Sequence, residues 1–201
     1  MAADDDPGGQ GLVRFAELPV VPWRNGGGVT REVVVGGSGF DPQEFDWRVS
    51  IADVNAPGPF SPFPGIDRVI MLVEGKRMDL VIDGVEHVLG LHQLLSFDGA
   101  SQVSSTLPAG PTRDLNVMTR RNRRSAAVAI MDLSETRPIA VAGCQVLVLL
   151  TGSAVVAGAG GRREELHPLD AVCPRGGHRR LVMGTGRVAF VRIEDEDKTG
   201  S

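Results

Sequence analysis

The chain has 201 residues, of which 42% are hydrophobic, and this is enough apolar material for one large or two small domains with a proper core. Its 21 basic and 25 acidic residues give a formal net charge of −4, so we expect no global attraction to nucleic acid or to an anionic membrane. The acidic N-terminus lacks the features of a signal peptide, and every apolar run is far shorter than the roughly 20 residues that span a bilayer. These features predict a cytoplasmic protein whose partner is a small molecule.

The first predicted structural feature is the segment from Trp23 to Glu32, which follows an acidic stretch, residues 1–11, polar enough to be a disordered tail. Asn25 here precedes Gly26-Gly27-Gly28, and glycines allow the backbone to approach another group closely. Two interpretations remain open. The segment is either a tight turn in which Asn25 bonds to its own backbone, or part of a binding site that uses Asn25 and Glu32.

A strand is predicted next over residues 47–52, because side chains of opposite character alternate there. Alternation places Trp47, Val49 and Ile51 on one face of a sheet, and Arg48, Ser50 and Ala52 on the other. The Arg48 guanidinium therefore has small neighbours and room for a carboxylate, which it can hold through two parallel hydrogen bonds. The alternative is a structural ion pair of Arg48 with Glu32 or Asp53, because buried charges need partners.

Three more polar residues are candidates for the same site. Ser61 closes the turn that begins at Gly58, and Arg68 opens the first of two sequence repeats, near the expected mouth of a barrel. A second arginine suits an anionic ligand. Asn116 projects opposite to its apolar neighbours and could donate an amide hydrogen bond, although a buried Asn satisfied by backbone groups at a sheet edge is the alternative.

An internal repeat runs through the remaining chain at one offset. Gly152 − Gly75, Gly161 − Gly84, Leu166 − Leu89 and Gly176 − Gly99 all equal 77, and the apolar segments 69–73 and 146–150 overlay at the same offset. Each copy consists of short alternating segments separated by glycine turns, of which Asp83-Gly84 is a strong hairpin signal. No segment keeps helical spacing for three turns. The sequence therefore predicts an all-β protein with two barrels and little helix.

The predicted boundaries are residues 12–118 for the first barrel, 119–193 for the second, and 194–201 for a disordered acidic tail. Between the copies lies a basic run from Arg120 to Arg124. It is predicted to be a solvated linker, because the aromatic residues that would stack on nucleic-acid bases are missing. The glycine-rich run 158–161 resembles a phosphate loop, but no helix follows it, so a hairpin turn is predicted.

Five sequence blocks together resemble the HutD/Ves family of small bacterial proteins: Trp23–Glu32, Phe45–Ala52, Gly58–Ser61, Pro64–Arg68 and Asp114–Met118. The resemblance covers roughly residues 12 to 190. It implies double-stranded β-helix (cupin) barrels in tandem, a bicupin, and a ligand site made of Asn25, Glu32, Arg48, Ser50, Ser61, Arg68 and Asn116. HutD-type proteins are associated with histidine utilisation, where they are thought to sense an intermediate such as urocanate or N-formylglutamate, whereas Ves-type relatives are known mainly as stress-induced proteins.

A metal is the usual expectation for a cupin, whose common motif has two His one residue apart, then a Glu and a later His. This chain departs from that motif. His87 and His92 are five apart, and residues five apart on a strand face opposite sides. No His superimposes on another at the 77-residue offset, so neither a metal nor another cofactor is predicted. Cys144 and Cys173 lack ligand spacing and are predicted to be unpaired, buried, small apolar residues.

The favoured hypothesis is a non-enzymatic bicupin that binds a small carboxylate, with Arg48 or Arg68 pairing its charge and Asn25 and Asn116 fixing its orientation. No Ser, Cys or Thr has a local His base pattern, so no catalytic residue is assigned. One alternative is a metal-free enzyme in which Glu32 is a general base. Another is a stress-induced interaction protein. The oligomeric state, including a homodimer, is left open by the sequence.

Overall fold

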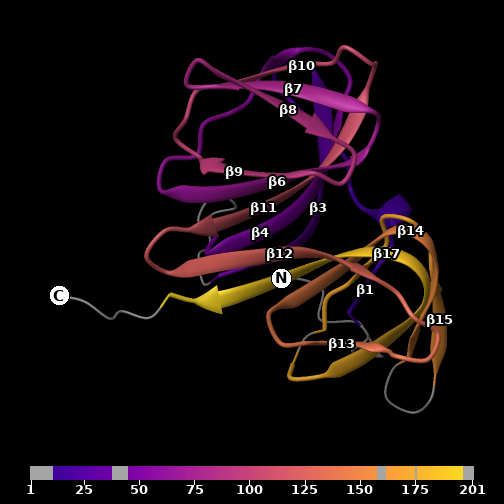
Figure 1. Ribbon diagram of the computed structural model, residues 1–201. Coiled ribbons are helices and arrows are strands. Elements are labelled where there is room, and N and C mark those ends of the chain that lie inside the picture. The colour runs from indigo at the N-terminus through magenta and orange to yellow at the C-terminus, as the bar shows by residue number, and fades with distance from the viewer. Residues whose placement is uncertain (1–10, 38–44, 158–161, 175, 197–201) are drawn as a thin grey trace. The chain divides into compact units, whose positions relative to one another are not determined.

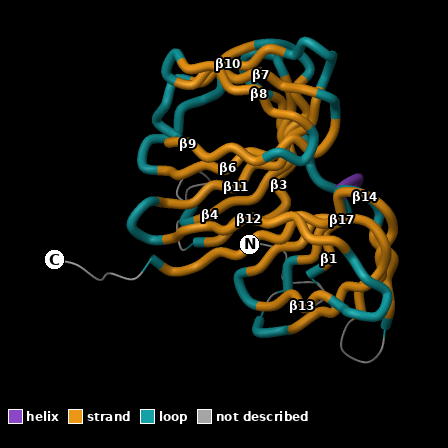
Figure 2. The backbone as a smooth tube through the Cα atoms, viewed as in Figure 1, coloured by secondary structure: helices purple, strands orange, loops and turns teal. Residues whose placement is uncertain are grey.

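The computed structural model describes residues 11–37, 45–157, 162–174 and 176–196 (Figure 1). Strands dominate the described residues, whose one helical element is a three-residue 3-10 turn, η1 (Phe15–Glu17), so the all-β prediction is confirmed (Figure 2). No helix within the described ranges is long and apolar enough to cross a membrane. The described residues form two compact units. The larger unit takes its residues from ranges 18–126 and 194–201, and the smaller unit from ranges 1–17 and 127–193.

Two antiparallel sheets form the larger unit. The six-stranded sheet has the order β2 (Val21–Pro22), β3 (Gly28–Gly36), β4 (Trp47–Val54), β11 (Thr112–Arg120), β6 (Ile66–Glu74) and β9 (Leu94–Asp98). The four-stranded sheet has the order β5 (Gly58–Pro59), β10 (Val103–Thr106), β7 (Arg77–Ile82) and β8 (Val85–Gly90). Ile70 and Leu72 of β6 pack with Met78 and Leu80 of β7 in one buried cluster, so the two sheets enclose a common core.

The hairpin predicted at Asp83-Gly84 is confirmed and joins β7 to β8. Both residues have positive φ, 50° and 83°, as a two-residue hairpin turn of this kind requires. Along β7 the buried side chains are Met78, Leu80 and Ile82, so the alternation of the sequence does place one face of this strand on the core.

A seven-stranded antiparallel sheet is the framework of the smaller unit. Its main order is β1 (Leu12–Val13), β16 (Ala171–Val172), β14 (Gln145–Ala157), β17 (Arg179–Asp195) and β12 (Arg124–Asp132), while β13 (Ile139–Ala142) pairs with β17 and β15 (Arg163–Leu166) pairs with β14. Leu147 and Leu149 of β14 lie fully buried against Val182 and Val188 of β17. The interior of this unit is therefore apolar along these strands.

The 77-residue offset relates equivalent turns of the two units. The His92 N–H donates to the Leu72 carbonyl at 2.8 Å, and 77 residues later the Leu169 N–H donates to the Leu149 carbonyl at 2.7 Å. Both donors have positive φ, 61° at His92 and 72° at Leu169. The residue that follows each, Gln93 or Asp170, accepts a backbone hydrogen bond with its side chain from the residue three positions earlier. The sequence repeat is thus a repeat of hydrogen bonding as well as of composition.

The structure moves the predicted boundaries. Leu12 of β1 pairs with Val172 of β16, so the first described residues belong with the second half of the chain, in the smaller unit. Strand β17 continues to Asp195, which forms an ion pair with Arg124 at 2.5 Å, so residues 194–196 are not a tail. The rest of both predicted tails, residues 1–10 and 197–201, and the turn predicted at 158–161 lie outside the described residues.

The basic run is the solvated connection that the sequence predicts, because residues 121–123 are exposed. It forms the tight connection between β11 and β12, with Asn122 at a positive φ of 63°. Arg121 contacts Asp67 at 2.6 Å and Asp98 at 2.9 Å, and Arg123 contacts Asp46 at 2.9 Å. Acidic residues that are distant in sequence therefore hold these arginines in place.

The cysteine prediction is correct for one residue and wrong for the other. Cys173 is buried next to β16, whereas Cys144 is exposed. Cys144 follows Gly143, which has a positive φ of 58°, in the turn that joins β13 to β14. Its place in a turn between strands explains the exposure, and neither cysteine forms a disulfide.

Candidate ligand-binding site

The larger unit contains a pocket with a volume of about 830 Å³. One wall is the six-stranded sheet, and the other consists of the chain around residues 21–25 and 59–64. Seven polar residues predicted for a ligand site all line it: Asn25, Glu32, Arg48, Ser50, Ser61, Arg68 and Asn116. Residues spread over more than ninety positions of sequence thus meet around one pocket.

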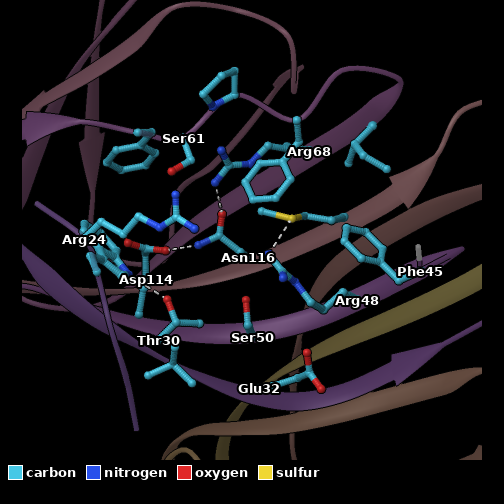
Figure 3. Close-up of a pocket in the computed structure, with 18 of the residues that line it drawn as sticks. Arg24, Thr30, Glu32, Phe45, Arg48, Ser50, Ser61, Arg68, Asp114 and Asn116 are labelled. Atoms are coloured by element: carbon cyan, nitrogen blue, oxygen red, sulfur yellow. Dashed lines mark hydrogen bonds between the residues drawn. The ribbon is translucent and has the colours of Figure 1, made fainter. Parts of the chain in front are cut away.

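Strand register explains why the predicted strand residues converge. Ser50 of β4 pairs with Glu32 of β3 on one side and with Asn116 of β11 on the other, which forms a row across the sheet. In the next row Met118 of β11 lies between Arg48 of β4 and Arg68 of β6. Because side chains in such rows project from the same face, the alternation predicted for residues 47–52 does direct Arg48 and Ser50 into the pocket (Figure 3).

A chain of three buried polar side chains crosses the pocket wall. Arg68, 5% exposed, donates through Nη2 to Asn116 Oδ1 at 2.6 Å, and Asn116 Nδ2 donates to Asp114 Oδ1 (Figure 3). Asp114 is fully buried. The amide orientation is fixed by this chain, since its oxygen must face the cation and its nitrogen the carboxyl.

Burial shifts the ionisation of both ends of this chain. It lowers the pKa of Arg68 to about 10, although Asp114 acts in the opposite direction. It also raises the pKa of Asp114 to about 7, against the opposing effects of the Arg68 charge and the Asn116 hydrogen bond. The site therefore contains a carboxyl group that exchanges a proton near neutral pH.

Arg48 makes its contacts mainly with apolar groups. Its Nη2 donates to the sulfur of Met118 at 3.2 Å, and its guanidinium carbon lies 4.9 Å from the ring centre of Phe45 and 5.4 Å from that of Phe63. Burial lowers the pKa of Arg48, and the charge of Glu32 opposes this. The aromatic rings thus pack against the guanidinium group of Arg48, and its remaining N–H groups stay available for a ligand in the pocket.

Two observations bear on the alternative of a structural ion pair at Arg48. Asp53, one suggested partner, is instead paired with Arg31 at 2.5 Å and with Arg113. Glu32, the other, acts on Arg48 only through the charge interaction that raises its pKa. The Nε atoms of both Arg48 and Arg68 are buried and have no hydrogen-bond partner. Within the part of the chain that the structure describes, the two arginines are thus not neutralised by a direct carboxylate contact.

The glycine segment takes the form of the tight turn. Asn25 Oδ1 accepts from the Gly27 N–H at 3.0 Å, and Asn25 Nδ2 donates to the Pro59 carbonyl at 3.4 Å, so both ends of this amide are already in use. Gly26 has a positive φ of 69°. A Cβ on Gly28 would collide with the Asp53 carbonyl and approach the ring of Trp23, which is the close approach that the glycines allow.

The wall opposite the sheet is anchored by its backbone. The N–H groups of Phe60 and Phe63 donate to the carbonyls of Val103 at 2.9 Å and Gly99 at 2.6 Å. These bonds set the two aromatic rings, and Ser61 between them, around the guanidinium of Arg68, which lies 5.6 Å from both ring centres. Ser61 remains exposed at the pocket.

Several residues of the pocket were missed by sequence reasoning. Asp114 could have been found, because it is two residues from Asn116 and alternation puts both on one face. The aromatic residues Phe45, Phe60 and Phe63 carried no such signal, since they lie outside regular strands. Arg24 and Arg120 also line the pocket, and Arg120 Nε donates to the Phe45 carbonyl at 3.0 Å.

The four histidines do not gather at the pocket. His87 lies on β8, His92 in the turn after it, and His167 and His178 are exposed in the smaller unit. Among residues 11–37, 45–157, 162–174 and 176–196, no group of three or more His, Cys, Asp or Glu side chains could hold a metal ion.

Comparison with known sequences gives consistent matches along most of the chain. A sequence model of the HutD family matches residues 16–190. A protein named Ves from Citrobacter koseri is 44% identical over 126 residues, which are 60% of this chain and 63% of that relative. An uncharacterized 21.2 kDa protein in the hutC 3′ region of Pseudomonas putida is 39% identical over 123 residues, 60% of this chain and 64% of the relative. Each match spans less than two thirds of the relative's length.

Comparison with solved structures covers more of the chain. The conserved protein PA5104 from Pseudomonas aeruginosa has a TM-score of 0.77 at 30% identity, covering 91% of this chain and 97% of that one. HutD from Pseudomonas fluorescens, solved in a formate condition, has a TM-score of 0.74 at 30% identity, covering 92% and 98%. A cupin 2 conserved barrel domain protein from Leptotrichia buccalis has a TM-score of 0.59 at 8% identity, covering 84% and 89%. At that identity the likeness shows the fold alone, which is cupin-like.

Proposed function

The chain belongs to the HutD family, and from this membership we propose that it is a bicupin whose larger unit binds a small carboxylate and thereby senses an intermediate of histidine utilisation. The observation that carries the proposal is the pair Arg48 and Arg68. Both guanidinium groups line one pocket, and their hydrogen bonds go to the Met118 sulfur and the Asn116 amide oxygen, so neither is neutralised by direct contact with a carboxylate of the described residues. A carboxylate offers the acceptors that such groups need.

The size and lining of the pocket suit a small organic anion. Its volume of about 830 Å³ lies within the usual range for small-molecule sites, and its wall combines aromatic rings with a few polar groups. Glu32, Ser50 and Ser61 add polar atoms around the two arginines, and Asn116 holds Arg68 in place. Asn25 stabilises the pocket wall and does not contact the ligand directly, because its amide bonds to backbone groups of the turn that closes the pocket.

The choice of ligand rests on the relatives. One is named for the hutC region of Pseudomonas putida, and another is HutD itself, solved in a formate condition. Urocanate and N-formylglutamate are therefore the first candidates, with formate as the smallest probe. We propose that the protein acts in the cytoplasm, without nucleic acid, membrane or metal.

The test is thermal unfolding of the metal-stripped protein with urocanate, N-formylglutamate, formate and histidine. A ligand at 100 times its dissociation constant should stabilise the fold by about 2.7 kcal/mol. Arg48→Met should abolish the shift, because Met keeps apolar contact with the rings of Phe45 and Phe63 but removes the charge. Arg77→Met is the matched control, since Arg77 is an exposed arginine of the same unit paired with Asp79.

A selective shift that Arg48→Met removes and Arg77→Met retains would support the sensor. An unchanged shift in Arg48→Met would show that the anion binds elsewhere. No shift with any compound would reject the carboxylate site and favour the Ves-like alternative of a stress-induced interaction protein. Turnover of a probe that is lost in Glu32→Gln would instead indicate an enzyme, because Glu32 is an acid that lines the pocket and could serve as its base.

A further inference from the structure

Asp114 is the buried acid of the pocket. It is fully buried, and although Oδ1 accepts from Asn116, Oδ2 has no hydrogen-bond partner. A buried carboxylate with one unsatisfied oxygen is costly, because nothing replaces the water it has lost. When the carboxyl group is ionised, its Oδ2 atom therefore lacks the hydrogen bond that a buried negative charge needs.

The charge of Arg68 reaches Asp114 only across the amide of Asn116. Arg68 donates to the amide oxygen at 2.6 Å, and the amide nitrogen donates to the carboxyl group. Asp114 is thus the internal counter-charge of Arg68 without forming a direct ion pair with it. A ligand anion at Arg68 would take over that role and add a second negative charge near the carboxyl group.

The other charged groups around Asp114 come from every neighbouring element. Asp53 of β4 is negative and raises the pKa of Asp114, while Arg68 of β6 lowers it. Further ionisable residues line the same pocket: Glu32 from β3, Arg48 from β4, Arg120 from β11, and Arg24 from the turn before β3. No histidine is among the lining residues described. Burial leaves Asp114 with a pKa of about 7, so it is the lining group placed to change charge near neutrality.

We propose that the pocket takes up its anionic ligand together with one proton, which Asp114 holds. This inference rests on the proposed carboxylate site and specifies its chemistry: the site binds the equivalent of a neutral acid, not a bare anion. The proton comes from solvent and bonds to a carboxyl oxygen of Asp114. The negative charge of the ligand then replaces the negative charge of Asp114 as the partner of Arg68. Above pH 7, where Asp114 is ionised in the free protein, the net charge of the pocket is therefore unchanged by binding.

The proposal predicts a pH dependence with a definite sign. Below pH 7 the carboxyl group is already protonated in the free protein, so affinity is constant. Above pH 7 each binding event must recruit a proton, so affinity falls by up to about tenfold for each pH unit. Arginine side chains stay charged throughout and give no such slope.

The experiment is isothermal titration calorimetry with formate and with N-formylglutamate, whose carboxyl groups stay ionised from about pH 6.5 to 8.5. Each titration is run in buffers of different ionisation enthalpy, and the slope of the observed enthalpy against that value counts the protons taken up. We expect close to one proton per ligand at pH 8, and close to none in Asp114→Asn, whose affinity should no longer change with pH. Asp79→Asn is the matched control, since Asp79 is a carboxyl group of the same unit that pairs with Arg77 on β7, away from the pocket, and the variant should retain the proton uptake.

The outcomes separate this inference from the function on which it rests. Binding with the same heat in every buffer would overturn the proton uptake and leave the carboxylate site standing. Uptake kept in Asp114→Asn would also overturn it. If neither probe binds at any pH, the carboxylate site fails and the inference fails with it. Should Asp114→Asn not fold, the Asp114 carboxyl carbon followed by NMR in the wild-type protein gives the same answer, because formate should raise its titration midpoint.

Discussion

Equivalent inward-facing strand positions are polar in the larger unit and apolar in the smaller unit. In the larger unit Arg68, Ile70 and Leu72 of β6 pair with Met118, Asn116 and Asp114 of β11. Adding 77 to the β6 positions gives Gln145, Leu147 and Leu149 of β14, which pair with Arg192, Phe190 and Val188 of β17. Where one unit has an asparagine and an aspartate facing inward, the other has a phenylalanine and a valine. A pocket in one unit and an apolar interior in the other thus follow from a few inward positions on a shared framework.

The largest effect is expected when the pocket is given the residues of the smaller unit. Arg68→Gln alone should lose carboxylate binding and, at pH 9, where Asp114 is ionised in the wild-type protein, destabilise the protein by about 3–5 kcal/mol. It leaves the buried Asp114 without its cation and the Asn116 amide oxygen without its donor. Adding Asn116→Phe and Asp114→Val should restore much of that stability, since the polar chain is then replaced by apolar side chains. Urea unfolding measures the stabilities, and calorimetry with formate measures the binding. A triple variant no more stable than Arg68→Gln would contradict the equivalence of these positions.

The next largest effect concerns the tightly filled interior. Leu149→Ala in the smaller unit should cost roughly 2–5 kcal/mol, because Leu149 is fully buried in the apolar cluster and its loss leaves a cavity. Ser50→Ala in the pocket wall removes one oxygen and should change stability by less than about 1 kcal/mol. Both values come from urea unfolding. Equal losses at the two positions would mean that the pocket wall is as tightly packed as the filled interior.

The elements of both units could largely be predicted from the sequence, because each depends on local signals. Strand β7 follows the alternation of residues 77–82, and the turn at Asp83-Gly84 follows from residues that tolerate positive φ. The pairing of β1 with β16 could not be predicted, since it joins Leu12 to Val172 through two-residue strands that carry no periodic pattern. Local sequence patterns therefore predict strands and turns, but pairing between residues far apart in sequence decides which unit a strand belongs to.

The candidate site shows the same division. Alternation placed Arg48 and Ser50 on one face, but only the register of β4 on β11 brings them beside Asn116. The acidic partners of the basic run, such as Asp46 and Asp98, are contributed by remote segments, so the sequence predicts the solvated connection but not its ion pairs. Pairs of this kind depend on the tertiary fold and leave no mark at the sequence positions themselves.

The stability of the larger unit should depend on pH near neutrality through Asp114, which has no counterpart in the apolar interior of the smaller unit. Its folded pKa, about 7, lies above the usual value for an Asp, so its contribution to stability is greatest in acid and falls as the pH rises to 7. Between about pH 6 and pH 8 the wild-type protein should lose about 1.4 kcal/mol through this group. Asp114→Asn should remove that component. The check is urea unfolding of both proteins across the range, and parallel curves would show that Asp114 is not the titrating group.

The smallest effect tests the paired turns. Gln93 accepts one backbone hydrogen bond, from Gly90 at 2.8 Å, in the larger unit. Its counterpart Asp170 accepts from the backbone N–H of His167 and of Phe15, both at 3.0 Å, and from Arg14 at 2.8 Å. Alanine at Asp170 should therefore cost about 1 kcal/mol more than alanine at Gln93, because more hydrogen bonds to a charged group are lost.

Hydrogen exchange distinguishes the two turn variants further. In Asp170→Ala the amides of residues 12–17 should exchange faster, since this carboxylate holds both the Phe15 backbone and the Arg14 side chain on the smaller unit. In Gln93→Ala the change should stay within the turn before β9. Unchanged exchange at residues 12–17 would mean that the pairing of β1 with β16 holds this segment by itself. Faster exchange would show that the Asp170 turn, unlike the Gln93 turn, also attaches residues 12–17 to the smaller unit.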